Sequence, residues 1–265
     1  MELNKIYNEN CLETLARMPD GSIDLTVTSP PYDNLRSYNG YEFDFEPIAQ
    51  ELYRVTKKGG VAVWVVGDAT INGSETGTSF KQALYFKEIG FNLHDTMIYR
   101  KTGLTFPETT RYYPSFEYMF VLTKGRPATI NLIADKVNAF AGNIVTGGSR
   151  QTNGDLTVRS GDGNLVKTLG IRQNVWDYGT GWMVSSPDKE AFGHGACFAE
   201  GLAKDHILSW SNENDIIYDP FMGSGTTAKM AHQLKRQWIG SEISSEYVEL
   251  ANKRLEPYLA QDSLF

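Results

Sequence analysis

The chain has 265 residues, which is long enough for one large domain or for one domain that carries an insert. Its hydrophobic content of 41% and its 10 prolines exclude a collagen-like or wholly disordered protein. No apolar run approaches the ~18 residues that a membrane span needs, and the first residues lack the layout of a signal peptide, so we expect a cytoplasmic protein. Cys11 and Cys197 match no metal-binding spacing, and we expect reduced thiols.

The net charge of −7 at first disfavours a polyanionic partner. Residues 97–175, however, hold ten Lys or Arg and five Asp or Glu, which gives this stretch a charge of +5. Subtracting +5 from −7 leaves −12 for the rest of the chain. This asymmetry is typical of a local contact with a nucleic-acid backbone. Random clustering of solvated charges is the plainer alternative.

The first 124 residues alternate helix and strand patterns. Asn10 is a typical N-cap for a helix over residues 11–18, and a β-rich strand over residues 23–27 follows. The continuous apolar run at residues 61–66 predicts a strand that is buried on both faces of a parallel sheet. The other elements expected in this part are helices at 45–56 and 79–89 and strands at 92–99 and 116–122.

Residues 125–190 are rich in Gly, Asn, Thr and Ser and lack sustained periodicity, which predicts an irregular insert with short elements at most. The same feature also permits disorder between residues 141 and 164. Regular patterns return in residues 191–265, with helices expected at 198–211, 226–235 and 244–259 and strands at 215–218 and 237–241. Alternation of strands and helices in 1–124 and 191–265, on both sides of the insert, predicts a doubly wound α/β fold with a mostly parallel sheet.

A short motif, Thr28-Ser29-Pro30-Pro31-Tyr32, follows the strand at 23–27. Two consecutive prolines stiffen the backbone in an extended shape and remove two N–H donors. The Ser29 hydroxyl and the Pro30 carbonyl can then accept hydrogen bonds from one planar amino group, and Tyr32 offers a ring for stacking a heterocycle. A loop that merely ends a strand is the alternative.

A Gly-rich motif lies where a strand ends and a helix begins, with the sequence Asp219-Pro220-Phe221-Met222-Gly223-Ser224-Gly225-Thr226-Thr227. Small residues let a ligand approach the backbone, and the helix N-terminus supplies free N–H groups. The spacing matches neither the dinucleotide pattern nor a P-loop, which disfavours pyrophosphate and nucleoside triphosphates.

Glu242 follows the next strand, 17 residues after Gly225. A carboxylate there can accept hydrogen bonds from both hydroxyls of a ribose and would repel a 2′-phosphate. S-adenosylmethionine, which has a ribose and no phosphate, fits these features. The alternative is an acidic residue that is favoured at a helix start by the helix dipole.

The two motifs together resemble motifs IV and I of DNA amino-methyltransferases. Their order, with the catalytic motif first and the cofactor motif last, resembles the β class of that family, in which the target-recognition region lies between them. Residues 8–13 resemble the start of the family, and residues 194–199 resemble its motif X, although Gly195 and Ala199 stand where the family usually has prolines. The resemblance covers nearly the whole chain outside residues 125–175.

The resemblance implies a seven-stranded, mostly parallel sheet of the methyltransferase type, S-adenosylmethionine as cofactor, double-stranded DNA as partner, and by analogy a homodimer. It implies catalytic roles for Ser29, Pro30, Pro31 and Tyr32. It implies cofactor contacts from Asn10, Cys11, Phe198, Asp219, Phe221, Gly223, Gly225, Thr226, Thr227 and Glu242. The charge of the insert and its flanks predicts DNA contacts from Arg111, Lys124, Arg126, Arg150, Arg159, Lys167 and Arg172.

The family chemistry is direct methyl transfer to an exocyclic nitrogen of a base that has been flipped out of the duplex. In this resemblance, Ser at the position of Ser29 goes mostly with cytosine N4, and Asp or Asn there goes mostly with adenine N6. Cytosine is therefore favoured, and adenine stays the alternative. No Pro-Cys pair occurs, which argues against methylation at carbon 5.

Two further classes stay open. Similar motifs also occur in methyltransferases that act on protein glutamine or on a small amine, since an amide nitrogen, like an exocyclic base nitrogen, is a poor nucleophile. The basic middle of the chain argues for nucleic acid instead. A binding module that keeps the fold without catalysis is the other class, and the intact motifs at both ends argue against it.

Overall fold

The computed structural model describes residues 1–31, 43–103, 109–193 and 198–262. Tyr32 and most of the segment that resembles motif X, residues 194–197, lie outside the described residues. The described part divides into two compact units, one formed by residues 1–131 and 174–265 and the other by residues 132–173. No helix among the described residues combines the length and the apolar character that crossing a membrane requires.

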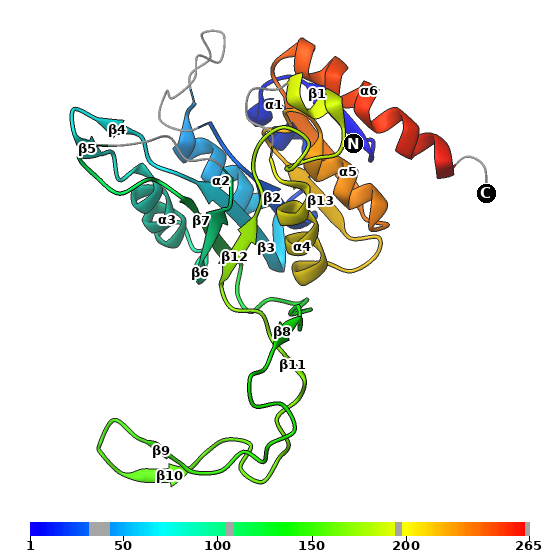
Figure 1. Ribbon diagram of the computed structural model, residues 1–265. Helices are drawn as coiled ribbons and strands as arrows, with labels where there is room; N and C mark the ends of the chain where they lie inside the picture. The colour runs from blue at the N-terminus through cyan, green and yellow to red at the C-terminus, as the bar shows by residue number, and fades with distance from the viewer. Residues whose placement is uncertain (32–42, 104–108, 194–197, 263–265) are drawn as a thin grey trace. The chain divides into compact units, whose positions relative to one another are not determined.

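The larger unit is built on a sheet of eight strands in the order β1-β14-β13-β2-β3-β7-β6-β12 (Figure 1). In that order the strands are Lys5–Asn8, Gln237–Glu242, Ile216–Asp219, Ile23–Thr28, Thr56–Val66, Phe116–Thr123, Asn92–Lys101 and Val175–Tyr178. Only β7 pairs antiparallel with its neighbours, and the other pairs are parallel. The doubly wound, mostly parallel α/β fold expected from the sequence is confirmed.

The sheet has one strand more than the seven that the resemblance implies. The additional strand is β12, which pairs in parallel with β6 and lies within the stretch 125–190 that the sequence predicts to be irregular. Trp176 of β12 is buried, with 7% of its surface exposed, so packing orders this short strand although its sequence shows no clear alternation. The edge strand β1 was also not expected, because four residues give too short a pattern; it forms by pairing with β14.

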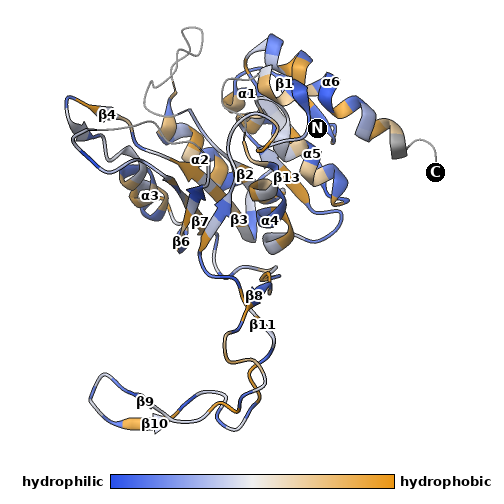
Figure 2. Cartoon of the chain, in the orientation of Figure 1, coloured by the Kyte–Doolittle hydropathy of each residue, from blue (hydrophilic) through white to orange (hydrophobic). Residues whose placement is uncertain are grey.

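The helices form two groups. The first group is α1 Cys11–Arg17, α2 Phe45–Val55 and α3 Thr78–Glu88, and the second is α4 Glu200–Trp210, α5 Thr226–Gln233 and α6 Ser245–Asp262. Alternate residues of β3, Ala62, Trp64 and Val66, belong to one core cluster with the buried side chains of α1, α2 and α3. The intervening valines of β3 are equally buried, and α4 packs against β2 and β3. Both faces of β3 are thus covered, as its continuous apolar sequence predicts (Figure 2).

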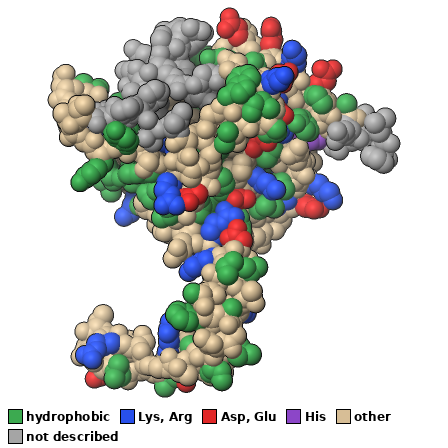
Figure 3. All heavy atoms as spheres, viewed as in Figure 1, with side chains coloured by type: hydrophobic (Ala, Val, Ile, Leu, Met, Phe, Trp, Pro, Cys, Tyr) green, Lys and Arg blue, Asp and Glu red, His purple; other side chains and the backbone are tan. Residues whose placement is uncertain are grey.

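Residues 132–173 form the smaller unit, which consists of short antiparallel ribbons. The strands are β8 Lys136–Val137, β9 Gly148–Arg150, β10 Leu156–Val158 and β11 Leu169–Gly170, and they pair as β9 with β10 and β8 with β11. Several of its large apolar side chains are exposed, including Leu156 at 70% and Val158 at 76%. In this unit, Lys and Arg side chains lie beside these apolar ones (Figure 3). The unit therefore has little core of its own.

Candidate active site

Four parallel strands, β1, β14, β13 and β2, lie side by side, and their carboxyl ends meet at one edge of the sheet. After β13 the chain continues through α5 to β14, whereas after β2 it continues through α2 to β3 on the other side. The sheet therefore reverses its winding between β13 and β2. Ligands of doubly wound sheets bind at such a switch point, outside the carboxyl ends of the strands. Both sequence motifs begin there.

A buried hydrogen bond joins the two motifs. The Thr28 hydroxyl donates to Asp219 Oδ1 at 2.6 Å, and the Phe221 N–H donates to the same oxygen at 3.0 Å. Burial raises the pKa of Asp219 to about 6, against the opposing effect of hydrogen bonds from Thr28, Thr227 and the Phe221 backbone. Asp219 thus has protein partners that hold the ends of β2 and β13 together. Thr28 was not among the predicted site residues; its position just before Ser29 was the available signal.

Ser29, Pro30 and Pro31 continue directly from Thr28 at the end of β2. Pro30 is buried, while Ser29 and Pro31 are half-buried. A hydroxyl and a carbonyl at this position supply acceptors, and neither proline supplies a competing N–H donor. The arrangement can therefore hold a group that donates two hydrogen bonds, such as an exocyclic amino group. Tyr32, the predicted stacking residue, lies outside the described residues.

The Gly-rich turn is tight and closely packed. Gly223 and Gly225 have φ values of +50° and +81°, a region that favours glycine. A Cβ atom added at Gly225 would lie 3.1 Å from the Cβ of Ala251 in α6. Immediately after the turn, Thr226 and Thr227 begin α5 and are almost fully buried. The turn lies at a helix N-terminus, whose backbone N–H groups suit a ligand that approaches the main chain.

Glu242 lies at the end of β14 and connects to the turn. Its Oε2 accepts the Gly223 N–H at 2.8 Å, and its Oε1 accepts the Ser244 N–H at 2.9 Å. A carboxylate has about four acceptor positions, more than its backbone partners occupy, so it can also accept from a ribose hydroxyl. Burial raises the pKa of Glu242, against the opposing effect of these backbone hydrogen bonds. The residues present therefore fit a ligand that carries a ribose, as the sequence predicts.

Two further predicted cofactor residues, Asn10 and Cys11, lie at the start of α1. Asn10 caps α1 by accepting the Leu12 N–H at 2.9 Å, and Asn8 pairs with Glu242 across β1 and β14, which brings this helix start beside the end of β14. Cys11 is a free, buried thiol whose pKa is raised to about 12 by burial, so it stays neutral and is no nucleophile.

Phe198 and Phe221 flank the turn in different ways. The Phe198 carbonyl accepts a long hydrogen bond, 3.5 Å, from the Thr226 hydroxyl. The Phe221 ring packs edge-on against Phe43, with centroids 5.6 Å apart, and against Trp64 at 6.2 Å. Phe43 was not expected near the site. It precedes α2 in an unremarkable sequence, and only the fold brings it to Phe221.

The predicted DNA-binding cations do not form one group. Arg150, Arg159 and Lys167 are exposed on the smaller unit, and Arg126 is exposed on the larger one.

The other three predicted cations have protein partners. Arg111 donates to the Thr70 hydroxyl and the Gly73 carbonyl, and Arg172 forms an ion pair with Asp135. Lys124 donates to the carbonyls of Tyr53 and Thr56 at 2.6 and 3.0 Å, and burial lowers its pKa. Lys124 therefore ties the end of α2 to β7.

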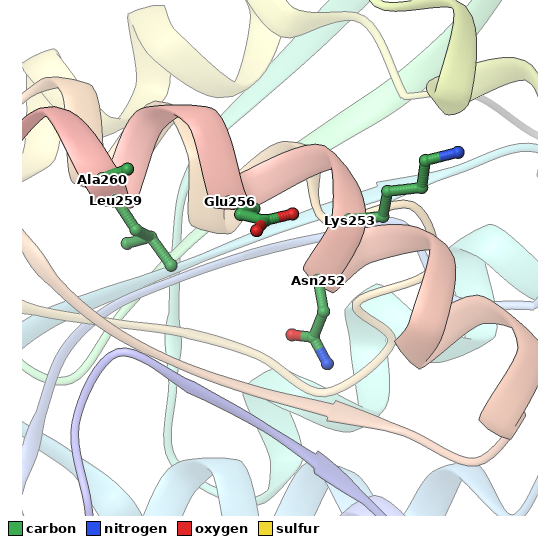
Figure 4. Close-up of a pocket in the computed structure, with 5 residues that line it drawn as sticks. All are labelled: Asn252, Lys253, Glu256, Leu259 and Ala260. Carbon is green, nitrogen blue, oxygen red and sulfur yellow. The ribbon is translucent and has the colours of Figure 1, made fainter.

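One shallow hollow lies on α6 and is lined by Asn252, Lys253, Glu256, Leu259 and Ala260 (Figure 4). All five side chains come from one helix, and none belongs to the two motifs. The hollow brings together no nucleophile and base. It therefore offers no alternative to the site at the strand ends.

The chain is similar to known DNA methyltransferases. The family model described as DNA methylase, for N6 and N4 methyltransferases, matches residues 23–253. The orphan methyltransferase M.BamHII of Bacillus amyloliquefaciens is 60% identical over 242 residues, which cover 91% of each chain. The solved PvuII DNA methyltransferase, described as cytosine-N4-specific, is similar in fold, with a TM-score of 0.67 and 19% identity over 94% of this chain and 85% of that one.

The solved complex of M1.HpyAVI with SAM is also similar in fold, with a TM-score of 0.59, 20% identity, and coverage of 95% of this chain and 98% of that one. The family model matches far more than half of the chain, and it includes both motifs. Together with the strand-end site, these matches show that the chain belongs to the family of N4/N6 amino-methylating DNA methyltransferases.

Proposed function

We propose that this DNA methyltransferase transfers a methyl group from S-adenosylmethionine to N4 of cytosine at a specific sequence in double-stranded DNA. The observation that carries the choice of base is Ser29 at the end of β2, because Ser at this motif position goes mostly with cytosine N4 in the family. Adenine N6 methylation is the alternative, and the experiment below distinguishes it from cytosine N4 methylation.

The strand-end geometry supports the proposed sites for the methyl donor and the acceptor base. S-adenosylmethionine supplies an electrophilic methyl group. Glu242 would accept hydrogen bonds from its ribose, and the Gly223–Gly225 turn would contact it through the backbone. The Thr28–Asp219 hydrogen bond supports a shared pocket, because it ties the turn to the segment that would hold the base.

The chain's own part in the chemistry is to orient a weak nucleophile. An exocyclic nitrogen reacts poorly because its lone pair is delocalised into the ring. The Ser29 hydroxyl and the Pro30 carbonyl would accept both N–H groups and direct the lone pair out of the ring plane. Fixed acceptors favour the positive charge that develops on nitrogen, and alignment lowers the barrier further. The nitrogen becomes acidic as it is methylated, so no strong base is needed.

We further propose that the smaller unit, residues 132–173, contacts the DNA. Its exposed cations Arg150, Arg159 and Lys167 suit phosphate contacts, and its short ribbons carry exposed apolar side chains. The base inside a duplex is inaccessible, so it would be flipped toward Ser29. Arg111, Lys124 and Arg172 are left out of this surface because their charged groups already bind protein partners.

The test is to incubate the protein with mixed-sequence DNA and labelled S-adenosylmethionine, digest the DNA to nucleosides, and identify the product by mass. We expect N4-methylcytosine. N6-methyladenine would overturn the choice of base, and unlabelled DNA would overturn the proposed activity.

A second test changes Ser29 itself. Ser29→Ala should lower turnover by about 100-fold, the size found for removing one preorganised polar group, with little change in cofactor affinity. Wild-type turnover in Ser29→Ala would remove the hydroxyl from the mechanism.

A further inference from the structure

A cluster of four charged side chains adjoins the Gly-rich turn on the side of α6. Arg254 of α6 and Lys229 of α5 are each only 2% exposed. The Arg254 Nε donates to Asp188 Oδ2 at 2.8 Å, and Nη2 donates to Glu200 Oε1 at 2.6 Å. Lys229 Nζ contacts the same two carboxylates at 2.7 and 2.8 Å. Two cations and two anions therefore balance in a nearly dry environment.

The third nitrogen of the Arg254 guanidinium reaches the turn itself. Nη1 donates to the Ser224 carbonyl at 2.8 Å and to the Thr226 hydroxyl at 2.9 Å, on either side of Gly225. One turn earlier in α6, the Cβ of Ala251 would lie only 3.1 Å from a Cβ at Gly225, so α6 packs tightly against the turn. The backbone of the turn is thus fixed against α6 both by hydrogen bonds and by packing.

The same cluster also reaches the other segment that the cofactor is expected to contact. The Thr226 hydroxyl, which accepts from Arg254, donates to the Phe198 carbonyl at 3.5 Å. Glu200 begins α4 only two residues after Phe198. One guanidinium therefore links the Gly-rich turn to the start of α4.

The energetics of buried ion pairs indicate why a charged cluster occupies this position. Desolvation largely cancels the attraction within a buried pair, so apolar side chains of the same volume would hold the helices together equally well. Apolar side chains cannot, however, fix a carbonyl and a hydroxyl at set distances, as the planar fork of Arg does. Burial opposes ionisation of Asp188, yet hydrogen bonds from Arg254, Lys229 and Tyr258 outweigh it and lower its pKa, which keeps the cluster charged.

We propose that Arg254 is a positioning residue for cofactor binding, which holds the Gly-rich turn and the Phe198 segment in the arrangement that S-adenosylmethionine requires. This inference rests on the proposed function, since it assumes that the turn binds that cofactor. Arg254 acts through the turn and does not itself touch the reacting groups.

The experiment compares two buried arginines. Arg254→Lys keeps the charge but cannot contact Asp188, Glu200 and the turn at once. Arg236→Lys is the matched control, because Arg236 is also buried, at 8% exposed, and donates to the carbonyls of Leu234 and Ser211 without touching the turn. Calorimetric titration gives the dissociation constant for S-adenosylmethionine, and thermal unfolding gives the stability of each variant.

We expect Arg254→Lys to weaken cofactor binding about tenfold, equivalent to ~1.4 kcal/mol. Its KM for S-adenosylmethionine should rise by a similar factor, while kcat and the affinity for DNA stay close to wild type. Arg236→Lys should lower the unfolding temperature and leave cofactor affinity unchanged. Equal cofactor affinity in Arg254→Lys and wild type, or equal weakening in both variants, would overturn the proposal.

A second pair of variants covers the case in which Arg254→Lys does not fold. Asp188→Asn removes the charge that holds the Arg254 Nε, whereas Tyr258→Phe removes a hydroxyl that contacts Asp188 and Lys229 and leaves every charge of the cluster in place. We expect Asp188→Asn to bind the cofactor about threefold more weakly than wild type, and Tyr258→Phe to bind it with wild-type affinity. Equal affinities in this pair refute the positioning role. Failure of the wild-type protein to bind S-adenosylmethionine would instead contradict the proposed function.

Discussion

The buried Asp219 carboxyl makes the stability of this protein depend on pH in a predictable direction. Its pKa is raised from 3.8 to about 6 because burial disfavours the charged form. The folded protein therefore binds this proton more tightly than the unfolded chain does. The resulting stabilisation is complete below pH 3.8 and is lost as pH rises through 6. Replacing Asp219 with Asn removes this dependence.

The shape of the site makes Asp219→Asn a mild substitution. Its Oδ1 can still accept from Thr28 and from the Phe221 N–H. The new Nδ2 can donate to the Thr227 hydroxyl, whose own proton can then go to the Val27 carbonyl. Linkage with a pKa raised from 3.8 to about 6 predicts that, between pH 5 and pH 7.5, the unfolding free energy of Asp219→Asn rises relative to wild type by about 1 kcal/mol.

Urea unfolding followed by tryptophan fluorescence at both pH values measures this difference. Thr28→Val is a second variant, in which the unfolding free energy should fall relative to wild type as pH rises. It removes a hydrogen bond from the ionised carboxylate, so it should destabilise the protein by about 1.5–3 kcal/mol at pH 7.5 and by less at pH 5. A free-energy difference between Asp219→Asn and wild type that does not change with pH would refute the reasoning.

Three other changes have expected outcomes. Glu242→Gln keeps an acceptor but loses the charge, so we expect calorimetry to show about tenfold weaker binding of S-adenosylmethionine; unchanged affinity would remove Glu242 from the cofactor site. Arg159→Ala should reduce the salt dependence of DNA binding by about one ion in a titration series, and an unchanged slope would argue against a phosphate contact. Lys124→Met should lower the unfolding free energy by about 1.5–3 kcal/mol, because the Tyr53 and Thr56 carbonyls lose their donor. Wild-type stability together with a weaker salt dependence of DNA binding would instead indicate that Lys124 contacts DNA.

The regular elements were largely predictable because their patterns are local. The helix starting at Thr226 begins where the sequence places it, and the run at 61–66 is a strand buried on both faces. The strand is nevertheless longer than predicted, since it begins at Thr56. The sequence predicts a helix that continues to Thr56 and no strand before residue 61, but Thr56 pairs with Ile23, and the register shifts between Ile23 and Leu25. Pairing with a distant strand outweighed local propensity there.

The sequence by itself determined the fold class, both motifs and their order, because strand periodicity and glycine placement are properties of short segments. Three features were decided only by the tertiary structure. These are the shared Asp219 hydrogen bonds, the Phe43–Phe221 contact and the Arg254 cluster. Each joins residues that are more than 25 positions apart or lie in different elements, so no local pattern encodes it. The strand ends bring these groups together because parallel strands present their carboxyl ends at one edge, and burial then sets their charge and geometry.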